Sequence, residues 1–381
     1  MALRAPAQRI ERFSPDADHA YTLPSHYYHE PEIYRREQEE IWFKTWQLVG
    51  YTFDLQEAGD YITGKIIDQQ VFVIRAKSGE LRAYYNVCMH RGHILVEGKG
   101  NKSILTCPFH AWSYDTHGAL KAAGNAENVA GFQHEDFSLS EIRVDTMANM
   151  VFVNLDPDAA PIVDYWPGLE DDILSKVPRF DDLKFVRQDY YDCDFNWKFV
   201  LDQNECYHCP TVHPGVMAGE GAYLEPSFDI TIHEHWDAVE VTADKDAESP
   251  YGAGGEDEVK DVYIWTAFPN LILLTHQGPS NFKVQIVWPE GPETAASTID
   301  NMCVNDPATE MDIKQFNYYR DRIWPEDSPC MTKQQRGMKS RGYNQGRLMI
   351  DPERTWKSEH AVHHFDMQVW EAINGKNWGD V

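Results

Sequence analysis

Two short stretches, CMH at residues 88–90 and CPFH at residues 107–110, decide how the first half of this chain folds. Each stretch offers one thiolate and one imidazole, and sixteen residues separate the two. Zinc sites usually keep like ligands together, as C-x-x-C followed by H-x3–5-H. A [2Fe–2S] cluster of mixed ligation instead takes both cysteines on one iron and both histidines on the other. The pattern therefore favours such a cluster over the alternative of a zinc ribbon-like site.

The residues around the two stretches are typical of short β-strands joined by turns. Apolar, β-branched or aromatic runs, broken by Asp68-Gln69 and by Ser78-Gly79, lie at 61–65, 71–76, 81–87 and 151–155. The two metal-binding stretches follow such runs, so that two loop tips can hold one cluster between them. Residues 46–160 are therefore predicted to form a β-rich domain.

The second half of the chain mixes helical and strand-like patterns. Strands are expected at 262–275 and at 282–288, where apolar residues alternate onto one face. Helices are expected at 197–207, 310–322 and 360–373. Residues 161–381 are therefore predicted to form an α+β domain. The N-terminal segment 1–45, with a helix beginning near Pro31, is expected to pack against it.

A second metal site is indicated around residue 208. His208 and His213 lie five residues apart, Glu205 precedes the first histidine by three positions, and Pro210 can bend the chain between the two histidines. Glu205 and His208 share a helix face at this spacing. Two histidines and one distant carboxylate make a facial triad that leaves coordination positions open, and Fe(II) is the metal that such a triad favours. Packed, non-ligating histidines are the alternative for this motif taken by itself.

Other cysteines and histidines are expected not to bind metal. Cys206 and Cys209 spell C-x-x-C without a surrounding βαβ pattern, which favours free thiols over a redox pair. His93 and His117 are expected to lie at the surface or to support a metal ligand without binding the metal, and the pairs at 233–235 and 363–364 are expected to be exposed to solvent.

Composition bounds the class of protein. The chain has 381 residues, of which 42% are hydrophobic and 25% charged, and its net charge is −27. The acidic charge argues against nucleic acid and anionic membranes as partners. No run is long and apolar enough for a membrane span, and the polar N-terminus does not resemble a secretory signal. We therefore expect a cytoplasmic protein, in which the seven cysteines form no disulfide framework.

With both motifs in place, the sequence resembles the α subunits of Rieske non-heme iron ring-hydroxylating oxygenases over nearly its whole length. The run ECYHC at 205–209, with Glu where most ring dioxygenases have Asp, is similar to the branch that acts on quaternary ammonium compounds such as carnitine, glycine betaine and stachydrine. The run QRGMKSRGY at 335–343 resembles the same branch. The resemblance implies an α+β protein with a β-rich Rieske [2Fe–2S] domain at 46–160. It also implies a helix-grip-like catalytic domain, an antiparallel sheet with helices, at 161–381.

The resemblance also implies roles for particular residues. The cluster ligands would be Cys88, His90, Cys107 and His110. The ligands of a mononuclear Fe(II) would be His208, His213 and Asp327, with Glu326 as the alternative to Asp327. A homotrimer is implied, in which Glu205 links His110 of one subunit to His208 of the next. The run from Trp197 to Glu205 is one residue shorter than this family leads us to expect.

The implied reaction is the O2-dependent hydroxylation of a small molecule. Because no G-x-G-x-x-G fingerprint occurs, NAD(P)H and flavin are expected on a separate reductase partner. Hydroxylation next to the nitrogen of a small quaternary ammonium compound would lead to N-demethylation or C–N cleavage. A cationic substrate needs aromatic or anionic surroundings. The candidates, against the alternative of core packing, are Tyr263, Trp265 and Phe268.

Two other functions are weighed against this one. An aromatic ring-hydroxylating oxygenase would share both metal motifs and differ only in its substrate. A Rieske-type electron carrier without catalysis would need only the first domain, and the residues beyond 160 argue against it.

Overall fold

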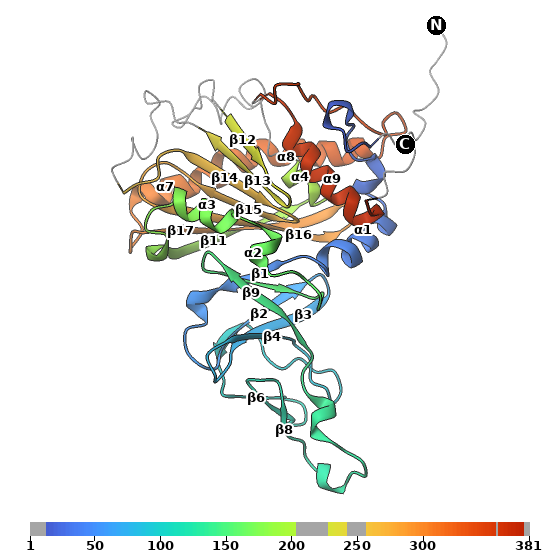
Figure 1. Ribbon diagram of the computed structural model, residues 1–381, viewed down its shortest axis with the longest axis vertical. Helices are drawn as coiled ribbons and strands as arrows, with labels where there is room; N and C mark the ends of the chain where they lie inside the picture. Colours follow the sequence, from blue (N-terminus) through green and yellow to red (C-terminus); the bar gives the residue numbers. More distant parts are fainter. Residues whose placement is uncertain (1–12, 203–227, 242–256, 356, 377–381) are drawn as a thin grey trace. The chain divides into compact units, whose positions relative to one another are not determined.

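The chain divides into two compact units, each with its own sheet. The computed structural model describes residues 13–202, 228–241, 257–355 and 357–376 (Figure 1). One unit is formed by Trp42–Glu170 and the other by Met1–Ile41 together with Asp171–Val381. Within these described ranges, every helix is too short or too polar to traverse a bilayer.

The unit formed by residues 42–170 is built on antiparallel strands, as the run of β-branched and aromatic residues predicts. One seven-stranded sheet has the order β1-β10-β9-β4-β3-β2-β5, and a three-stranded sheet has the order β6-β7-β8. The strands of the larger sheet are β1 (Gln47–Tyr51), β2 (Asp60–Ile66), β3 (Gln69–Arg75), β4 (Leu81–Tyr85), β5 (Lys99–Asn101), β9 (Glu141–Met147) and β10 (Met150–Asn154). The smaller sheet consists of β6 (Ile104–Thr106), β7 (Ser113–Asp115) and β8 (Leu120–Ala122). A short helix, α2 (Ile162–Tyr165), follows. The expected β-rich domain is confirmed.

The other unit contains a second seven-stranded antiparallel sheet, with the order β11-β17-β16-β15-β14-β13-β12. Its strands are β11 (Lys184–Cys193), β12 (Phe228–Ile232), β13 (Trp236–Val241), β14 (Val262–Ala267), β15 (Leu271–Thr275), β16 (Asn281–Gly291) and β17 (Thr294–Cys303). The single strand expected at 262–275 is in fact two strands. The chain turns between them at residues 268–270, where Pro269 has no N–H to give to a central ladder.

Helices accompany this sheet on both faces. They are α1 (Pro31–Glu37), α3 (Leu169–Lys176), α4 (Lys198–Leu201), α7 (Glu310–Tyr318), α8 (Trp324–Met338) and α9 (His360–Asn374). A 3-10 helix, η2 (Ser25–Tyr28), precedes α1, and a π-helical turn, η8 (Tyr319–Ile323), joins α7 to α8. Thr309 begins α7 with a capping box, in which its hydroxyl accepts from the Asp312 N–H and the Asp312 carboxylate accepts from the Thr309 N–H.

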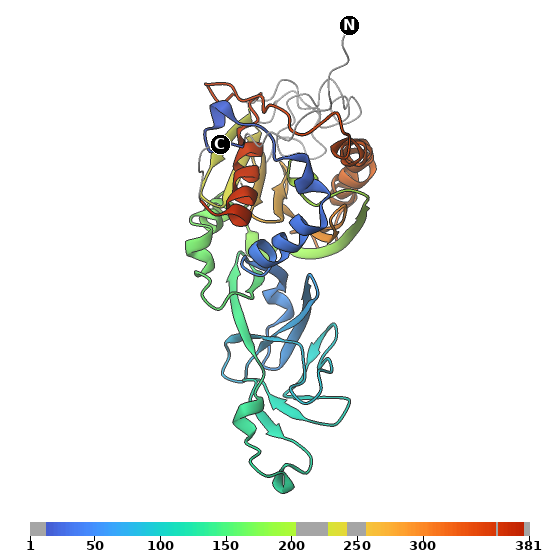
Figure 2. The ribbon, with the colours of Figure 1, turned by 90° about the vertical axis from the view of Figure 1, so that its right-hand side faces the viewer.

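The two faces of this sheet have different coverings. On one face, called here the α3 face, Trp265 Nε1 donates to Asp172 of α3 at 2.7 Å. On the other, called the α8 face, Tyr319 of η8 donates to Gln285 of β16 at 3.3 Å. Figures 1 and 2 together show α3 and the run from α7 to α8 on opposite sides of the strands. The expected antiparallel sheet with helices is confirmed.

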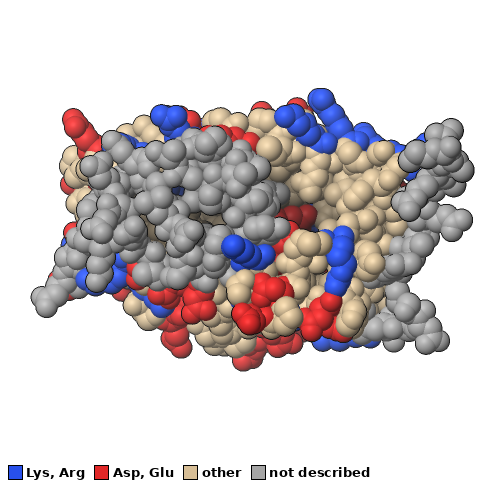
Figure 3. All heavy atoms as spheres, turned by 90° about the horizontal axis from the view of Figure 1, so that it is seen from above, with Lys and Arg blue, Asp and Glu red and all other residues tan. Residues whose placement is uncertain are grey.

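Acidic side chains dominate the chain's charge, and they are unevenly spread. Figure 3 shows Asp and Glu gathered along one edge of the face that it presents, beside scattered Lys and Arg. This distribution gives the described surface no continuous basic patch on that face, as the net charge of −27 leads one to expect.

Candidate metal centres

The loops that carry the two metal-binding stretches have the same backbone design. In the loop after β4, Cys88 N–H donates to the His93 carbonyl and the Cys88 carbonyl accepts from Gly92. In the loop after β6, Cys107 N–H donates to the Trp112 carbonyl and the Cys107 carbonyl accepts from Ala111. The fourth residue after each cysteine is left-handed, with φ of 74° at Gly92 and 58° at Ala111. The two loops therefore present a cysteine and a histidine each in matching backbone frames.

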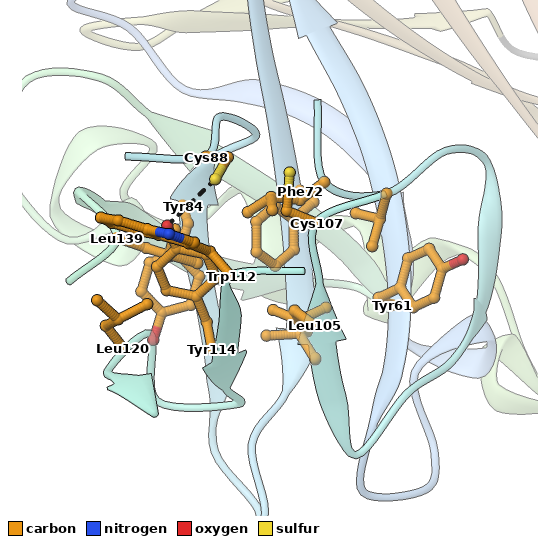
Figure 4. Packing of buried hydrophobic residues seen from close by; sticks show 13 residues of the cluster. Tyr61, Phe72, Tyr84, Cys88, Leu105, Cys107, Trp112, Tyr114, Leu120 and Leu139 are labelled. Atoms are coloured by element: carbon orange, nitrogen blue, oxygen red, sulfur yellow. Dashed lines mark hydrogen bonds between the residues drawn. The ribbon is translucent and has the colours of Figure 1, made fainter. Parts of the chain in front are cut away.

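The two cysteines are buried in the unit formed by residues 42–170, and the two histidines are exposed at its surface. Cys88 and Cys107 are 2% and 3% exposed, carry free thiols, and belong to one buried cluster, with both sulfur atoms at the same end of it (Figure 4). His90 and His110 are exposed, with ring centroids 5.0 Å apart. Two buried thiols in one cluster and two neighbouring exposed imidazoles fit the residue types of a [2Fe–2S] cluster with both cysteines on one iron and both histidines on the other.

A tyrosine hydroxyl points at one of the two sulfurs. Tyr114 is fully buried, and its Oη lies 3.4 Å from Cys88 Sγ. The same oxygen accepts the Met89 N–H at 3.0 Å, so its own hydrogen is left to donate toward the sulfur (Figure 4). Burial raises the pKa of the Cys88 thiol and of the Tyr114 hydroxyl. A bound iron would counter this effect at the cysteine, because a coordinating thiol loses its proton to the metal.

The histidine end of the site is framed by aromatic rings. Trp112 stacks on His90 with ring centroids 4.7 Å apart and an interplanar angle of 10°. Phe109, beside His110, is 51% exposed and lies 5.6 Å from the Arg91 guanidinium. The two imidazoles thus reach the surface of this unit among large side chains that leave their edges accessible.

The other histidines near the cluster loops are surface residues, as expected. His93 is exposed, with Nδ1 at 2.6 Å from the Ile94 carbonyl. His117 is exposed and lies near Ser78 and Glu80.

The histidine pair at 363–364 differs from the expectation of solvent exposure. His363 and His364 are 4% and 5% exposed, because they lie on α9 where it packs on the chain. His363 Nε2 is 2.8 Å from the Ser14 carbonyl, and His364 Nε2 is 3.3 Å from the Glu234 carbonyl. Buried polar groups are normally hydrogen-bonded, and each of these imidazoles has a main-chain carbonyl within reach.

Of the mononuclear iron ligands expected from the sequence, one lies in the described part of the chain. Glu205, His208 and His213 lie outside the described residues, as do Cys206 and Cys209. Asp327 is half-buried in the first turn of α8, beside Glu326.

An aromatic cluster that the sequence analysis did not single out precedes Asp327. Trp324 lies 4.6 Å from Tyr191 of β11 and 6.3 Å from Tyr319, measured between ring centroids. Burial raises the pKa of Tyr319, and the charge of Asp327 adds to that shift. Asp327 is therefore near this cluster in space as well as in sequence. The signal that could have found it is the placement of Tyr319 and Trp324 within the eight residues before Asp327.

The aromatic residues proposed from the sequence lie elsewhere. Tyr263 and Trp265 point to the α3 face, where Lys176 Nζ lies 4.8 Å from the Tyr263 ring centroid. This placement favours the core-packing alternative for both. Phe268 points to the opposite face, with its ring centroid 6.2 Å from that of Phe365 on α9.

The chain that leads toward residue 205 is held by a buried ion pair. Lys198 Nζ of α4 lies 2.5 Å from Glu37 Oε1, and both side chains are fully buried. Trp197 Nε1 donates to the other Glu37 oxygen at 3.0 Å. Tyr28 then donates to Asp202 at 2.9 Å, directly ahead of the segment with the expected ligands.

Comparison with known families matches both halves of the chain. Residues 180–375 match the family described as ring hydroxylating alpha subunit (catalytic domain), and residues 45–133 match the Rieske [2Fe-2S] domain. The chain is 33% identical over 359 residues to the carnitine monooxygenase oxygenase subunit of Escherichia coli (strain K12), covering 93% of this chain and 94% of that one. It is 28% identical to the chloroplastic choline monooxygenase of Arabidopsis thaliana, covering 91% of this chain and 82% of that one.

Solved structures show the same likeness. The quaternary ammonium Rieske monooxygenase CntA in complex with L-carnitine superposes with a TM-score of 0.84 at 30% identity, covering 97% of this chain and all of that one. Naphthalene 1,2-dioxygenase from Rhodococcus sp. superposes with a TM-score of 0.75 at 19% identity, which shows the shared fold.

Proposed function

This chain belongs to the Rieske ring-hydroxylating oxygenase family, and we propose that its substrate is a small quaternary ammonium compound of the carnitine or betaine type. It is an oxygen-incorporating oxidoreductase with a Rieske [2Fe–2S] domain and the catalytic domain of a non-heme iron oxygenase. The substrate proposal is supported by the similarity to carnitine monooxygenase oxygenase subunits and to choline monooxygenases. Carnitine and choline share a trimethylammonium group.

The observation that carries the proposal is the aromatic cluster beside Asp327. Tyr191, Tyr319 and Trp324 bring three electron-rich rings together on the α8 face of the sheet. A quaternary ammonium ion is held over such rings within about 6 Å of their centroids, because it cannot donate a hydrogen bond. The Tyr319 hydroxyl donates to Gln285, whereas the Tyr191 hydroxyl is buried without a hydrogen-bond partner in the described part of the chain.

We propose His208, His213 and Asp327 as the ligands of the mononuclear iron and Glu205 as the residue that links it to a cluster. Cys88, His90, Cys107 and His110 would hold the cluster, which supplies electrons while the mononuclear iron activates O2. The exposure of His90 and His110 suits transfer across a subunit boundary, in a homotrimer that receives electrons from a separate flavin reductase using NAD(P)H.

The residues of this chain would decide which carbon reacts. Rings that hold the ammonium group place an N-methyl carbon, or the next carbon along, toward Asp327. Hydroxylation consumes O2, two electrons and two protons, and it yields one water. A hydroxymethyl ammonium product then loses formaldehyde and a proton to leave a tertiary amine. Hydroxylation at the other carbon attached to nitrogen cleaves the C–N bond in the same way.

The proposal is tested by single turnover of the reduced holoenzyme with O2. We expect formaldehyde, or an amine and an aldehyde, from carnitine, γ-butyrobetaine or choline. A cis-diol or phenol from an aromatic hydrocarbon, with no turnover of the amines, would instead establish the ring-hydroxylating alternative.

Two matched variants test which aromatic residues bind the cation. Trp324→Leu should weaken binding of the amine on the order of tenfold, as expected when a cation–π contact of about 1–2 kcal/mol is lost. Tyr263→Leu removes a ring from the α3 face and should leave the affinity unchanged. If Tyr263→Leu weakened binding and Trp324→Leu did not, Tyr263 would be the residue that binds the cation.

A further inference from the structure

We propose that Lys283, with Gln315 and His276, forms a subsite for the carboxylate of a zwitterionic substrate. The inference rests on the proposed function, because it extends the same site from the ammonium end of the molecule to the other end. Carnitine and choline make the distinction concrete, since both carry trimethylammonium and only carnitine carries a carboxylate. The subsite would therefore add affinity for betaine-like zwitterions that choline does not gain.

Lys283 is a buried lysine that has no carboxylate partner among the described residues. Its side chain, on β16, is 2% exposed and points to the α8 face. Its Nζ contacts are both long, at 3.4 Å to His276 Nε2 and 3.4 Å to the Gln315 carbonyl. Among the residues that the structure describes, no carboxylate forms an ion pair with it. A buried ammonium that lacks an anion is costly, so stability alone gives no reason for a lysine here.

The acid whose charge acts on Lys283 is engaged elsewhere. Asp189 of β11 accepts two hydrogen bonds from Arg187, at 3.1 and 3.2 Å, and one from Asn301 at 3.0 Å. Burial, helped by the charge of Arg187 and opposed by that of Asp189, lowers the pKa of Lys283 to about 7. Burial and the charge of Lys283 likewise lower the pKa of His276 well below its usual value. The surroundings of Lys283 thus lack one negative charge.

Gln315, whose main-chain carbonyl contacts Lys283 Nζ, carries a second unmet group. Its side chain on α7 is 3% exposed, and both Nε2 and Oε1 are buried without a hydrogen-bond partner in the described part of the chain. Buried amides are normally satisfied by protein, by water or by a ligand. The Gln315 N–H and the Lys283 ammonium are both donors, and donors of this kind are what a carboxylate accepts from.

The position of this subsite suits a molecule that is held at both ends. Gln315 lies one helical turn before Tyr319, and Lys283 lies two residues before Gln285 on the same face of β16. A hydrogen bond joins Tyr319 to Gln285, and Lys283 contacts the Gln315 main-chain carbonyl. These two contacts therefore lie side by side between β16 and the helical run from α7 to η8. Two residues along a strand correspond to about 7 Å. The three-carbon chain between the ammonium and carboxylate of carnitine is of comparable length.

The test is anaerobic titration calorimetry of the holoenzyme with carnitine and with choline, in two buffers of different ionisation enthalpy. Near pH 8 the wild-type protein should take up a proton when carnitine binds, because the carboxylate restores the charge of Lys283. Choline should bind without this uptake. Lys283→Met should weaken carnitine binding at least tenfold, abolish the proton uptake and leave choline affinity unchanged. Gln315→Leu should weaken carnitine binding severalfold, also with choline unaffected.

Lys176→Met is the matched control, because Lys176 is a lysine on the α3 face. Retained choline affinity and an unchanged cluster spectrum show that a variant is folded. Equal effects of Lys283→Met on both ligands, or no effect on either, would overturn the subsite. A wild-type enzyme that binds choline and not carnitine would also overturn it while leaving the proposed function standing. A wild-type enzyme that binds neither compound would overturn both.

Discussion

At the scale of single residues, hydroxyl and carboxyl groups in buried places have effects that can be measured. Tyr114 and Tyr84 belong to the same buried cluster, yet only Tyr114 has its hydroxyl at a cysteine sulfur. Asp202 and Asp366 each keep one buried carboxylate oxygen without a hydrogen-bond partner in the described part of the chain. These contrasts allow variants to be paired.

Tyr114→Phe should lower the reduction potential of the cluster by an amount on the order of tens of millivolts. A hydrogen bond donated to a ligand sulfur stabilises the reduced, more negative cluster, and its loss is worth about 1 kcal/mol. Redox titration followed by EPR measures the shift. Tyr84→Phe removes a hydroxyl from the same core without touching a cysteine, and its potential should equal that of the wild type. Equal potentials for all three proteins would mean that the Tyr114 hydroxyl does not act on the cluster.

Asp366→Asn should raise stability more at about pH 8 than at about pH 5. Burial raises the pKa of Asp366 well above its usual value and that of Asp202 to about 7. The folded protein therefore binds more protons than the unfolded chain between about pH 4 and 7. The stability that these protons provide is full at low pH and is lost as the pH rises through the folded pKa. Asparagine mimics the protonated acid and can still accept the Leu23 N–H. Urea unfolding at the two pH values measures the difference, and a pH-independent difference would contradict the assignment.

At the scale of secondary-structure elements, a buried ion pair joins α1 to α4. Glu37 ends α1, Lys198 begins α4, and the Lys198 ammonium also lies 5.2 Å from the Tyr28 ring centroid of η2. The neighbouring elements η2 and α1 are therefore fixed to the distant α4 at one point, immediately before the chain that carries the expected iron ligands.

Lys198→Met should destabilise the protein by about 3–5 kcal/mol, because it leaves the Glu37 carboxylate buried and uncompensated. The double variant Glu37→Gln with Lys198→Met should recover most of this loss, since the glutamine oxygen can still accept from Trp197. Lys176→Met breaks the partly exposed pair with Glu240 and should cost less than about 1 kcal/mol. Denaturant unfolding distinguishes these cases. If the loss of stability in the double variant equals the sum of the losses in the two single variants, the Glu37–Lys198 pair is not the cause.

At the scale of the whole molecule, the proposed path for electrons runs between two copies of the chain. His90 and His110 lie at the surface of the unit formed by residues 42–170, and Asp327 lies in the other unit. The exposed imidazole edges suit a contact with a neighbouring subunit that supplies the mononuclear iron.

Mixed trimers test this arrangement. His90→Ala should remove the Rieske cluster and His208→Ala the mononuclear iron, so each variant alone should be inactive. If electrons cross between subunits, trimers assembled from both variants should regain a measurable fraction of wild-type turnover. If electrons stay within one subunit, every chain in the mixture lacks one metal and no activity returns. Iron content and cluster absorption of each variant provide the control.

The sequence by itself determined the strand-rich first domain and singled out the residues proposed to hold its cluster. Cys88, His90, Cys107 and His110 could be found because a cluster held by two loops needs its ligands in two short runs, and short spacing is visible in a sequence. The carboxylate proposed for the second site is far from the proposed histidines along the chain, so the choice of Asp327 rested on family resemblance.

Only the tertiary structure decided which side chains share a face of the second sheet. Tyr263 and Trp265 looked suited to a cation, yet they point to α3, whereas Tyr191, Tyr319 and Trp324 gather beside Asp327 from three separate elements. The burial of His363, His364 and Lys283 likewise could not be predicted from the sequence. Residue type and local period report which residues alternate along a strand or helix. They do not report which neighbour covers each face, because that depends on contacts between residues that are distant in the chain.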